Sequence, residues 1–267
     1  MTNDNSVRLQ GKKAIITGAG SGIGRETSIR FVQEGAQVVL VDRNTEGMKQ
    51  TLQSIQALGR EAHAIQADIS KESQIQSMVN TAIASVGDIN ILVNAAAVLI
   101  RTQQTHQVSE AEWDLIMNTN LKGTFLCCKH VIPSMINTGS GSIINISSVS
   151  GIRGAGYSLP YGVGKAGVIH LTTMVAQQYT GNGIRVNCVA PGLVDTPQSR
   201  GSTASTETFE SRIKTHPMQR VGTPNEISNL ILLILHRLLQ IYRVPLPYLV
   251  MLHSLSLHHP VFILDIF

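Results

Sequence analysis

Short, fully apolar segments alternate with amphipathic helical segments along most of this 267-residue chain. The apolar segments have the length of strands, and they lack the polar alternation of strands that have one face in water. Strands that are apolar throughout are buried on both faces, which indicates a parallel sheet covered by helices on each side. We therefore predict an α/β fold with a single doubly wound, Rossmann-type sheet. The apolar segments are KAIITG (13–18), QVVLVD (37–42), INILVNAA (89–96), SIINIS (142–147) and RVNCVAP (185–191), and helical patterns cover 24–35, 45–59, 72–86 and 158–179.

The composition of the chain is that of an ordinary enzyme, with 43% hydrophobic and 14% charged residues. The net charge of +4 comes without any cluster of Lys and Arg interleaved with aromatic residues, so we expect no nucleic-acid partner. The three Cys form neither a disulfide framework nor a metal-ligand spacing, so we expect no metal and a reducing, cytoplasmic compartment. The polar first residues lack the apolar run of a secretory signal.

A glycine-rich turn, TGAGSGIG, joins the first predicted strand to the first predicted helix, with the spacing Gly18-x-x-x-Gly22-x-Gly24. Glycines here permit a tight turn and let backbone N–H groups approach a pyrophosphate at the positive end of the helix. Ligands of doubly wound sheets bind outside the carboxyl ends of the strands, which is where this turn lies. The turn therefore predicts a dinucleotide site, and a glycine-rich turn without a ligand is the alternative.

Asp42 ends the second predicted strand and is the residue that would choose between two dinucleotides. A carboxylate there accepts hydrogen bonds from both ribose hydroxyls of NAD and repels the 2′-phosphate of NADP. The alternative role is that of a strand-end Asp that begins a turn. Arg43 is able to pair with a 2′-phosphate, so NAD is favoured and NADP stays possible. Asp68 ends a further predicted strand, EAHAIQAD (61–68), where it either bonds the adenine amine or caps the following turn.

The segment YGVGK places Tyr161 and Lys165 four residues apart, on one face of a predicted helix. A phenol has a pKa near 10, so it needs a stabilised phenolate to act as an acid or base near neutrality. An ammonium one turn away supplies that stabilisation. Ser148 follows the strand SIINIS and lies 13 residues before Tyr161, where its hydroxyl is able to polarise a substrate carbonyl.

Taken together, these motifs resemble those of the short-chain dehydrogenase/reductase family, and the resemblance runs from about Gly11 to Leu235. The matching elements are TGAGSGIG, Asp42, Asp68, NAAA (94–97), Asn120 in NTNLKGTF, Ser148, Tyr161, Lys165 and PGLVDT (191–196). The resemblance implies a hydride transfer that interconverts a secondary alcohol and a ketone, with NAD, or NADP, as cofactor and a small alcohol or ketone as substrate. It also implies a homo-tetramer or dimer.

In this resemblance Tyr161 is the acid or base, and Lys165 lowers the pKa of the tyrosine and binds the nicotinamide ribose. Ser148 orients the carbonyl, and Asn120 holds a water that relays protons to Lys165. Val194 and Thr196 hold the carboxamide. The implied catalytic residues are Asn120, Ser148, Tyr161 and Lys165, and the implied cofactor-binding residues are Gly18, Ser21, Gly22, Ile23, Gly24, Asp42, Arg43, Asp68, Ile69, Asn94, Ala96, Tyr161, Lys165, Pro191, Val194 and Thr196.

Two further segments of the chain bear on the predicted cleft. NAAA places Ala95 and Ala97 where the family commonly has an amide and a glycine, which removes a polar contact and narrows the space beside the nicotinamide ribose. The segment 194–218 is polar, rich in small residues and follows a strand end, which is typical of a mobile substrate lid. We expect this segment to set substrate specificity, although its sequence does not identify the substrate.

The chain departs from the family after about Leu235. Thr223 and Glu226 form a predicted capping box, with Pro224 at the first helical position, and this last helix matches the family. The family's final strand and Asp-Gly-Gly ending are absent, so the final strand is atypical or missing. We therefore assign residues 1–235 to an NAD(P)-binding Rossmann-type domain and residues 236–267 to an atypical apolar tail.

Three interpretations of this tail differ in what they imply for function. A shifted reading frame or a misassigned exon boundary accounts for the abrupt change of composition, and the segment 260–267 has a strand-like composition that would substitute for the lost strand. Without a substitute, an apolar sheet edge is exposed and the protein is a cofactor-binding but catalytically impaired relative. A membrane anchor is disfavoured, because Arg237 and Arg243 lie near the middle of the apolar stretch and Pro245 and Pro247 break its helix.

Overall fold

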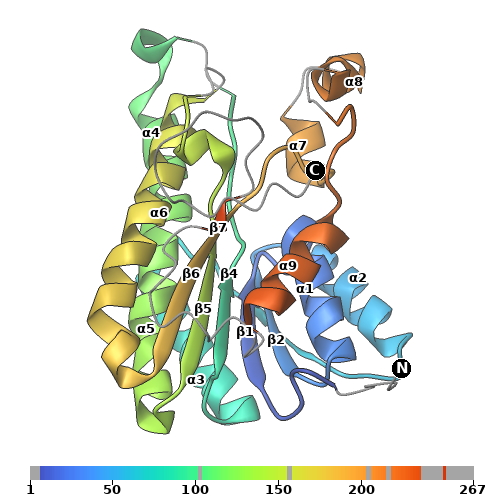
Figure 1. Ribbon diagram of the computed structural model, residues 1–267, viewed down its shortest axis with the longest axis vertical. Coiled ribbons are helices and arrows are strands. Elements are labelled where there is room, and N and C mark those ends of the chain that lie inside the picture. The colour runs from blue at the N-terminus through green and yellow to red at the C-terminus, as the bar shows by residue number, and fades with distance from the viewer. Residues whose placement is uncertain are drawn as a thin grey trace.

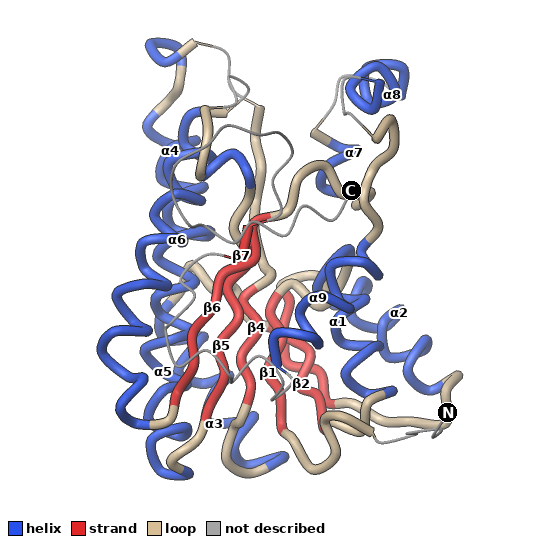
Figure 2. The backbone as a smooth tube through the Cα atoms, in the orientation of Figure 1, coloured by secondary structure: helices blue, strands red, loops and turns tan. Residues whose placement is uncertain are grey.

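The computed structural model describes residues 7–101, 104–154, 158–202, 206–214, 218–235 and 249–250 of the protein. These residues form one parallel sheet between two layers of helices (Figures 1 and 2). The prediction of a doubly wound α/β fold is therefore confirmed. The divisions of the chain at residue 235 and the origin of the tail stay predictions, because 236–248 and 251–267 lie outside the described residues.

The strands are hydrogen-bonded in the order β3-β2-β1-β4-β5-β6-β7, and every neighbouring pair is parallel. The chain winds outward from β1 in one direction to β3 and then returns to place β4 on the other side of β1. This reversal leaves a crevice at the carboxyl ends of β1 and β4, where ligands of such sheets bind. The strands are β1 (Lys13–Thr17), β2 (Gln37–Asp42), β3 (His63–Gln66), β4 (Ile91–Asn94), β5 (Gly141–Ile146), β6 (Ile184–Ala190) and β7 (Leu249–Val250).

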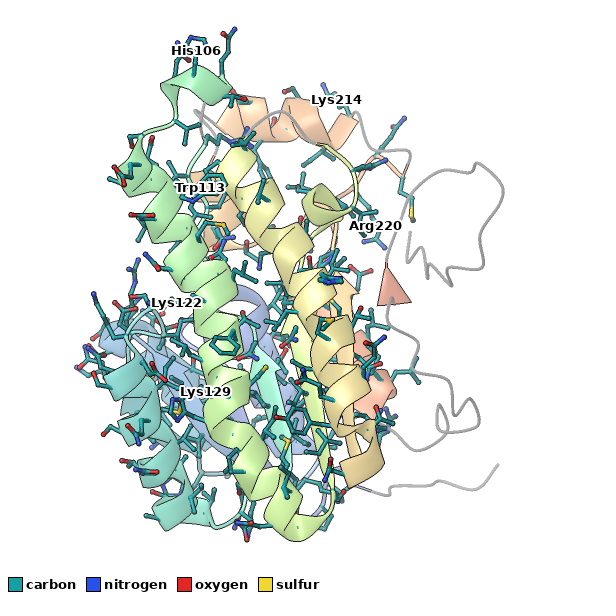
Figure 3. The ribbon with its side chains drawn as sticks, turned by 90° about the vertical axis from the view of Figure 1, so that its left-hand side faces the viewer. His106, Trp113, Lys122, Lys129, Lys214 and Arg220 are labelled. Atoms are coloured by element: carbon teal, nitrogen blue, oxygen red, sulfur yellow. The ribbon has the colours of Figure 1, made fainter. Side chains whose placement is uncertain are left out.

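Three helices cover each face of the sheet. The helices α1 (Gly22–Gln33), α2 (Thr45–Gln56) and α9 (Pro224–Leu235) lie on one face, and α3 (Glu72–Val86), α5 (Gly123–Thr138) and α6 (Leu159–Tyr179) lie on the other (Figure 1). Figure 3 looks onto this second layer, where Lys129 of α5 bonds Glu72 of α3 with 2.7 Å between Nζ and Oε1. Shorter helices lie beyond the carboxyl ends of the strands: α4 (Glu110–Ile116), α7 (Pro197–Gly201) and α8 (Thr206–Lys214).

Alternate side chains of each central strand enter two separate cores. In β1, Ala14 and Ile16 pack under α1 and α9, whereas Ile15 packs under the opposite helix layer. In β2, Leu40 faces the first core and Val39 faces the second. Both faces of the strand are therefore apolar, which is the physical reason for the continuous apolar runs in the sequence.

The helix α9 has defined ends. Thr223 and Glu226 form the predicted capping box, since the Thr223 N–H donates to Glu226 Oε2 at 2.7 Å and the Glu226 N–H donates to Thr223 Oγ1 at 3.3 Å. At the other end, the Arg185 guanidinium donates to the carbonyls of Ile234 and Leu235 at 3.1 and 3.3 Å. These carbonyls have no partner within the helix, so Arg185 of β6 caps α9 and joins it to the sheet.

The position beside β6 is taken by the two-residue strand β7, which pairs Leu249 with Val189 and Val250 with Ala190. This pairing lies at the carboxyl end of β6, and the prediction of an atypical or missing final strand stays a prediction, because the residues on both sides of β7 lie outside the described ranges. The segment 260–267, proposed from the sequence as a substitute, lies outside the described residues. No helix among the described residues is long and apolar enough to cross a membrane.

Candidate active site

A cleft of about 480 Å³ opens at the carboxyl ends of the strands, where the direction of winding reverses. It brings together residues that are up to 184 positions apart, from Gly18 after β1 to Ser202 after α7 (Pro197–Gly201). The lining includes every predicted site residue except Asn94 and Asn120: Gly18, Ser21, Gly22, Ile23, Gly24, Asp42, Arg43, Asp68, Ile69, Ala96, Ser148, Tyr161, Lys165, Pro191, Val194 and Thr196.

The glycine-rich turn forms one wall of the cleft and fits a dinucleotide. Gly22 begins α1 with a φ of +50°, a conformation that side chains rarely adopt, and a Cβ at this position would lie 3.1 Å from the Thr196 methyl group. A Cβ on Gly24 would overlap the carbonyl oxygen of Gly18. The turn therefore holds a bare backbone against the cleft at the positive end of a helix, which suits a pyrophosphate.

Side chains from α1 and α2 hold the glycine-rich turn from behind. The Arg25 guanidinium donates to the carbonyls of Gly20 and Gly47, the latter at 3.2 Å, and its Nε donates to Thr51 Oγ1 at 3.2 Å. Thr51 Oγ1 in turn donates to the carbonyl of Ala19 at 2.8 Å. The sequence analysis did not identify Arg25 or Thr51. Their contacts span 5 to 32 positions and follow no local pattern.

Asp42 uses both carboxylate oxygens to fix the backbone around the cleft. Oδ2 accepts from the Gly20 N–H and Oδ1 accepts from the Asn44 N–H, both at 2.9 Å. Each oxygen has a second lone pair, so the carboxylate is still able to accept from ribose hydroxyls. The two alternatives for Asp42, a turn-forming Asp and a ribose-binding Asp, are therefore compatible.

Asp68 lines the same end of the cleft and caps the turn that follows it, since Oδ1 accepts from the Ser70 N–H at 2.9 Å. Partial burial raises the pKa of Asp68, but the hydrogen bonds from Ser70 and the charges of Arg43 and Lys71 outweigh this and lower it below the ordinary value. The carboxylate stays ionised and available as an acceptor for an amine.

Ser148, Tyr161 and Lys165 lie together at the other end of the cleft, and all three are buried. Ser148 follows β5 and its Oγ accepts from the Ser150 N–H at 3.2 Å, which leaves its own hydroxyl hydrogen free to be donated. Tyr161 and Lys165 share one face of α6, and Lys165 Nζ lies 5.6 Å from the centre of the Tyr161 ring. The predicted acid–base group and the predicted cation are therefore neighbours.

Lys165 is the one lysine whose ammonium is held inside the described fold. Its side chain is 3% exposed, and Nζ donates to the Ile146 carbonyl at 2.7 Å. Burial lowers the pKa of Lys165 to about 8, and the nearby Cys188 thiol partly opposes this. The ammonium form still predominates at pH 7.

Ser147 fixes the backbone of Lys165 and is another residue that the sequence analysis did not identify. Its buried Oγ donates to the Lys165 carbonyl at 2.7 Å, and its N–H donates to the Val189 carbonyl at 2.7 Å. Gly151 approaches the same turn of α6, where an added Cβ would lie 2.6 Å from the Lys165 carbonyl carbon. The loop after β5 and the catalytic turn of α6 therefore form one tightly packed unit.

Asn94 and Asn120 lie behind the cleft. Asn94 Nδ2 donates to Asn145 Oδ1 at 2.9 Å within a buried polar row, and Asn145 Nδ2 continues it to Thr172 at 2.9 Å. Asn120 lies in a π-helical turn (Met117–Lys122), and its amide exchanges two hydrogen bonds with the Val98 backbone, at 2.8 and 2.9 Å. These contacts hold the central strand and the wall of the cleft. The predicted roles of both residues toward cofactor and proton relay stay predictions.

The predicted lid contains α7 and α8, which are joined by a polar contact. Arg200 of α7 forms an ion pair with Asp195, with 2.6 Å between Nη2 and Oδ2, and its guanidinium stacks 4.9 Å from the centre of the buried Phe209 ring of α8. Thr196 begins α7 with a capping box to Ser199. The Asp195–Arg200 pair thus spans the turn that carries Thr196 into the cleft.

Cysteine and metal chemistry have no support in the described part of the chain. Cys127, Cys128 and Cys188 are free and buried, and burial raises the pKa of the Cys128 thiol to about 12 and that of Cys188 to about 11. They are core thiols rather than nucleophiles. Among the described residues, no group of His, Cys, Asp and Glu is arranged to hold a metal ion.

Comparison with known proteins gives a consistent result. The short chain dehydrogenase family matches residues 12–207. The chain is 38% identical to a hydroxy(phenyl)methylsuccinyl-CoA dehydrogenase subunit of Thauera aromatica, over 84% of this chain and 89% of that one. It is also 38% identical to a 3-oxoacyl-(acyl-carrier-protein) reductase of Thermotoga maritima, over 85% and 91%. The crystal structure of levodione reductase, 33% identical, superposes with a TM-score of 0.83 over 86% of this chain and 92% of that one.

Proposed function

Since the chain belongs to the short-chain dehydrogenase family, we propose that it is an NAD-dependent oxidoreductase that interconverts a secondary alcohol and a ketone. The observation that carries this proposal is the cleft that joins the glycine-rich turn to Ser148, Tyr161 and Lys165. The printed names of the relatives support the reaction class, because they describe one dehydrogenase of a hydroxy compound and two reductases of oxo compounds.

The residues around the glycine-rich turn would hold the dinucleotide along the cleft. Backbone N–H groups at the start of α1 would bind the pyrophosphate, Asp42 the adenosine ribose, and Thr196 and Val194 the carboxamide. The bound nicotinamide would supply or accept the hydride. The Asp42 carboxylate favours NAD, because it would repel a 2′-phosphate, and Ser21 adds no positive charge to the turn.

Tyr161 and Ser148 would act on the substrate oxygen. During reduction the Tyr161 hydroxyl gives its proton to the developing alkoxide, and during oxidation the phenolate takes the proton back. The Ser148 hydroxyl donates to the same oxygen and stabilises its charge. The Lys165 ammonium, 5.6 Å from the ring centre, favours the phenolate form and holds the ribose beside it.

The two alternative functions, an impaired relative and a tail-anchored enzyme, predict different experimental results. An impaired relative would bind NADH but turn over no alcohol or ketone, and a tail-anchored enzyme would sediment with membranes. The buried free cysteines suit the reducing compartment that we infer, the cytoplasm. The contacts described above leave the number of subunits as a prediction from the family.

Replacing Tyr161 with Phe tests the proposed function. The ring and its packing stay, and only the proton-carrying hydroxyl is lost, so we expect turnover to fall by about a thousandfold. NADH affinity, measured from the fluorescence of the bound cofactor, should stay within about twofold. Val163→Ala, an exposed change on the same helix, is the control. A wild-type protein that binds no nicotinamide cofactor, or a Y161F protein with full turnover, overturns the proposal.

A further inference from the structure

The charges that line the cleft differ between its two ends. Asp42 and Asp68 are the acidic side chains of the lining, and they lie with Arg43 at the ends of β2 and β3. Arg153 and Lys165 lie at the other end, beside the loop after β5. Three strand spacings separate β2 from β5 in the sheet order, a distance on the order of 14 Å. The end of the cleft where the substrate would react is therefore positively charged.

The sequence explains why no acidic side chain balances this charge locally. No Asp or Glu occurs between Asp114 and Asp195, a stretch that forms α5, β5, α6 and β6. Figure 3 looks onto this half of the molecule, where Lys122 adds to its positive charge and Lys129 is paired with Glu72 of α3. Asp195, the next acidic residue along the chain, is bound by both nitrogens of Arg200.

Arg153 differs from the arginines that hold the fold together. Arg25 and Arg185 bind backbone carbonyls, and Arg200 binds a carboxylate. Within the described part of the chain, the exposed side chain of Arg153 has no hydrogen-bond or ion-pair partner, although its backbone N–H is fixed to the Val149 carbonyl at 3.0 Å. The backbone is held while the guanidinium is left available inside the cleft lining.

Other residues of the cleft lining provide hydrogen-bonding groups without charge. Ser150 lies in the same loop as Arg153, and Gln198 and Ser202 line the cleft from the α7 side. A guanidinium beside uncharged polar groups binds the oxygens of a carboxylate or phosphate through charge-assisted, bidentate hydrogen bonds, which are stronger than its hydrogen bonds to an amide. A neutral ketone would form no such bonds with Arg153.

We propose that Arg153 forms a subsite for an anionic group of the substrate, a carboxylate or a phosphate, carried apart from the carbon that reacts. This inference rests on the proposed function for the identity of the cleft as a substrate site. The substrate class is then an oxo or hydroxy compound that bears a negative charge. Arg153 is a specificity residue, because it contacts the substrate away from the reacting carbonyl.

The test measures binding of three small probes to the NADH-loaded protein by calorimetry. The probes are benzoate, phenyl phosphate and the neutral benzamide. We expect at least one anion to bind about tenfold more tightly than benzamide, as a charge-assisted contact implies. The R153M variant should lose this preference, R153K should keep most of it, and R60M, an exposed arginine outside the cleft lining, should leave it unchanged. Whichever anion binds more tightly identifies the anionic group.

Equal binding of all three probes to the wild type, or an unchanged preference in R153M, overturns the subsite. Loss of the preference in R60M as well assigns it to general surface charge and also overturns the subsite. These outcomes are separable from failure of the proposed function. That function fails on the absence of NADH binding or on an active Y161F protein, whereas NADH affinity should be the same in R153M and in the wild type.

Discussion

At the cofactor end of the cleft, polar side chains from outside the glycine-rich turn hold its backbone, whereas at the catalytic end the backbone holds the side chains. Arg25 and Thr51 bind the carbonyls of the turn, and Asp42 binds one of its N–H groups. Lys165, in contrast, donates its own ammonium to a backbone carbonyl. The contacts at the cofactor end therefore fix the shape of the turn, and the contact at the catalytic end fixes the position of the Lys165 charge. Substitutions at the two ends should consequently differ in what they change.

The strongest test of the shape-dependent end is Gly24→Ala. The added methyl group would overlap the Gly18 carbonyl, so the turn has to open, and we expect NADH affinity to fall by more than about a hundredfold. Gly181→Ala is the matched control, because a Cβ there has no neighbour within 4 Å. Titration of NADH fluorescence measures both variants. A G24A protein with normal affinity would show that the turn does not hold the cofactor.

Asp42→Ser tests whether charge also acts at the cofactor end. We expect NADH affinity to fall by about ten- to thirtyfold and NADPH affinity to rise, because the repulsion of a 2′-phosphate is removed. The variant also loses contacts to Gly20 and Asn44, so its melting temperature is recorded alongside. Glu61→Gln, an exposed change outside the cleft, is the control. A variant that prefers NADH as strongly as the wild type contradicts the role of Asp42 as selector.

The charge-dependent end should reveal itself in the pH dependence of stability. Burial lowers the pKa of Lys165 from 10.5 to about 8, so the unfolded chain binds more protons between pH 8 and 10.5. The contribution of this residue to the free energy of unfolding therefore rises with pH across that window, by up to about 1.4 kcal/mol per pH unit, and is constant below pH 8. It is complete above pH 10.5 and is lost as the pH falls to 8.

Comparison with Lys165→Met isolates this contribution. Urea unfolding at pH 7, 8 and 10 gives the difference between the two proteins, and groups that titrate in both without contact to Lys165, such as Cys128, cancel to first order. We expect the wild type to gain stability relative to K165M between pH 8 and 10. A difference that does not vary with pH would mean that the ammonium is solvated in the native state.

Ser147→Ala should give the smallest effect, because the hydroxyl that it removes is bonded to the backbone of the catalytic turn. It leaves the buried Lys165 carbonyl without its side-chain donor, so we expect a loss of about 1 kcal/mol in stability and a two- to fivefold fall in kcat. The pH profile of kcat should shift as well, since a purely structural role would leave it in place. Ser54→Ala removes the same kind of bond at an exposed position and should change neither. An unshifted profile would limit Ser147 to stability.

Local patterns in the sequence were sufficient to predict the layers of the fold and most of the cleft. Residues such as Gly22, Asp42 and Tyr161 lie directly after strands or at fixed helical spacing, so their meeting follows from the topology. Arg25 and Ser147 could not be predicted in this way, because each binds a backbone carbonyl that only the packed structure brings near. Asn94 is a predicted site residue, but its polar partner Asn145 on the neighbouring strand β5 could not be predicted.

The pairing of β7 with β6 could not be predicted from the sequence either. Two residues are too few to produce a periodic pattern, and neither Leu249 nor Val250 differs from its apolar surroundings. Because the segment 260–267 has a strand-like composition, the sequence predicts the substitute strand there instead. Composition indicates which segments are able to form strands, but it does not identify which of them pairs with the edge of the sheet.

The Arg185 cap on α9 also defines a junction in the chain. Its guanidinium satisfies the carbonyls of Ile234 and Leu235, so the last helix is closed by a residue of the sheet itself. Nothing that follows residue 235 is needed to supply those hydrogen bonds. An engineer who wished to replace the ending with that of a relative would therefore join the two sequences after Leu235, where the graft keeps both hydrogen bonds from Arg185.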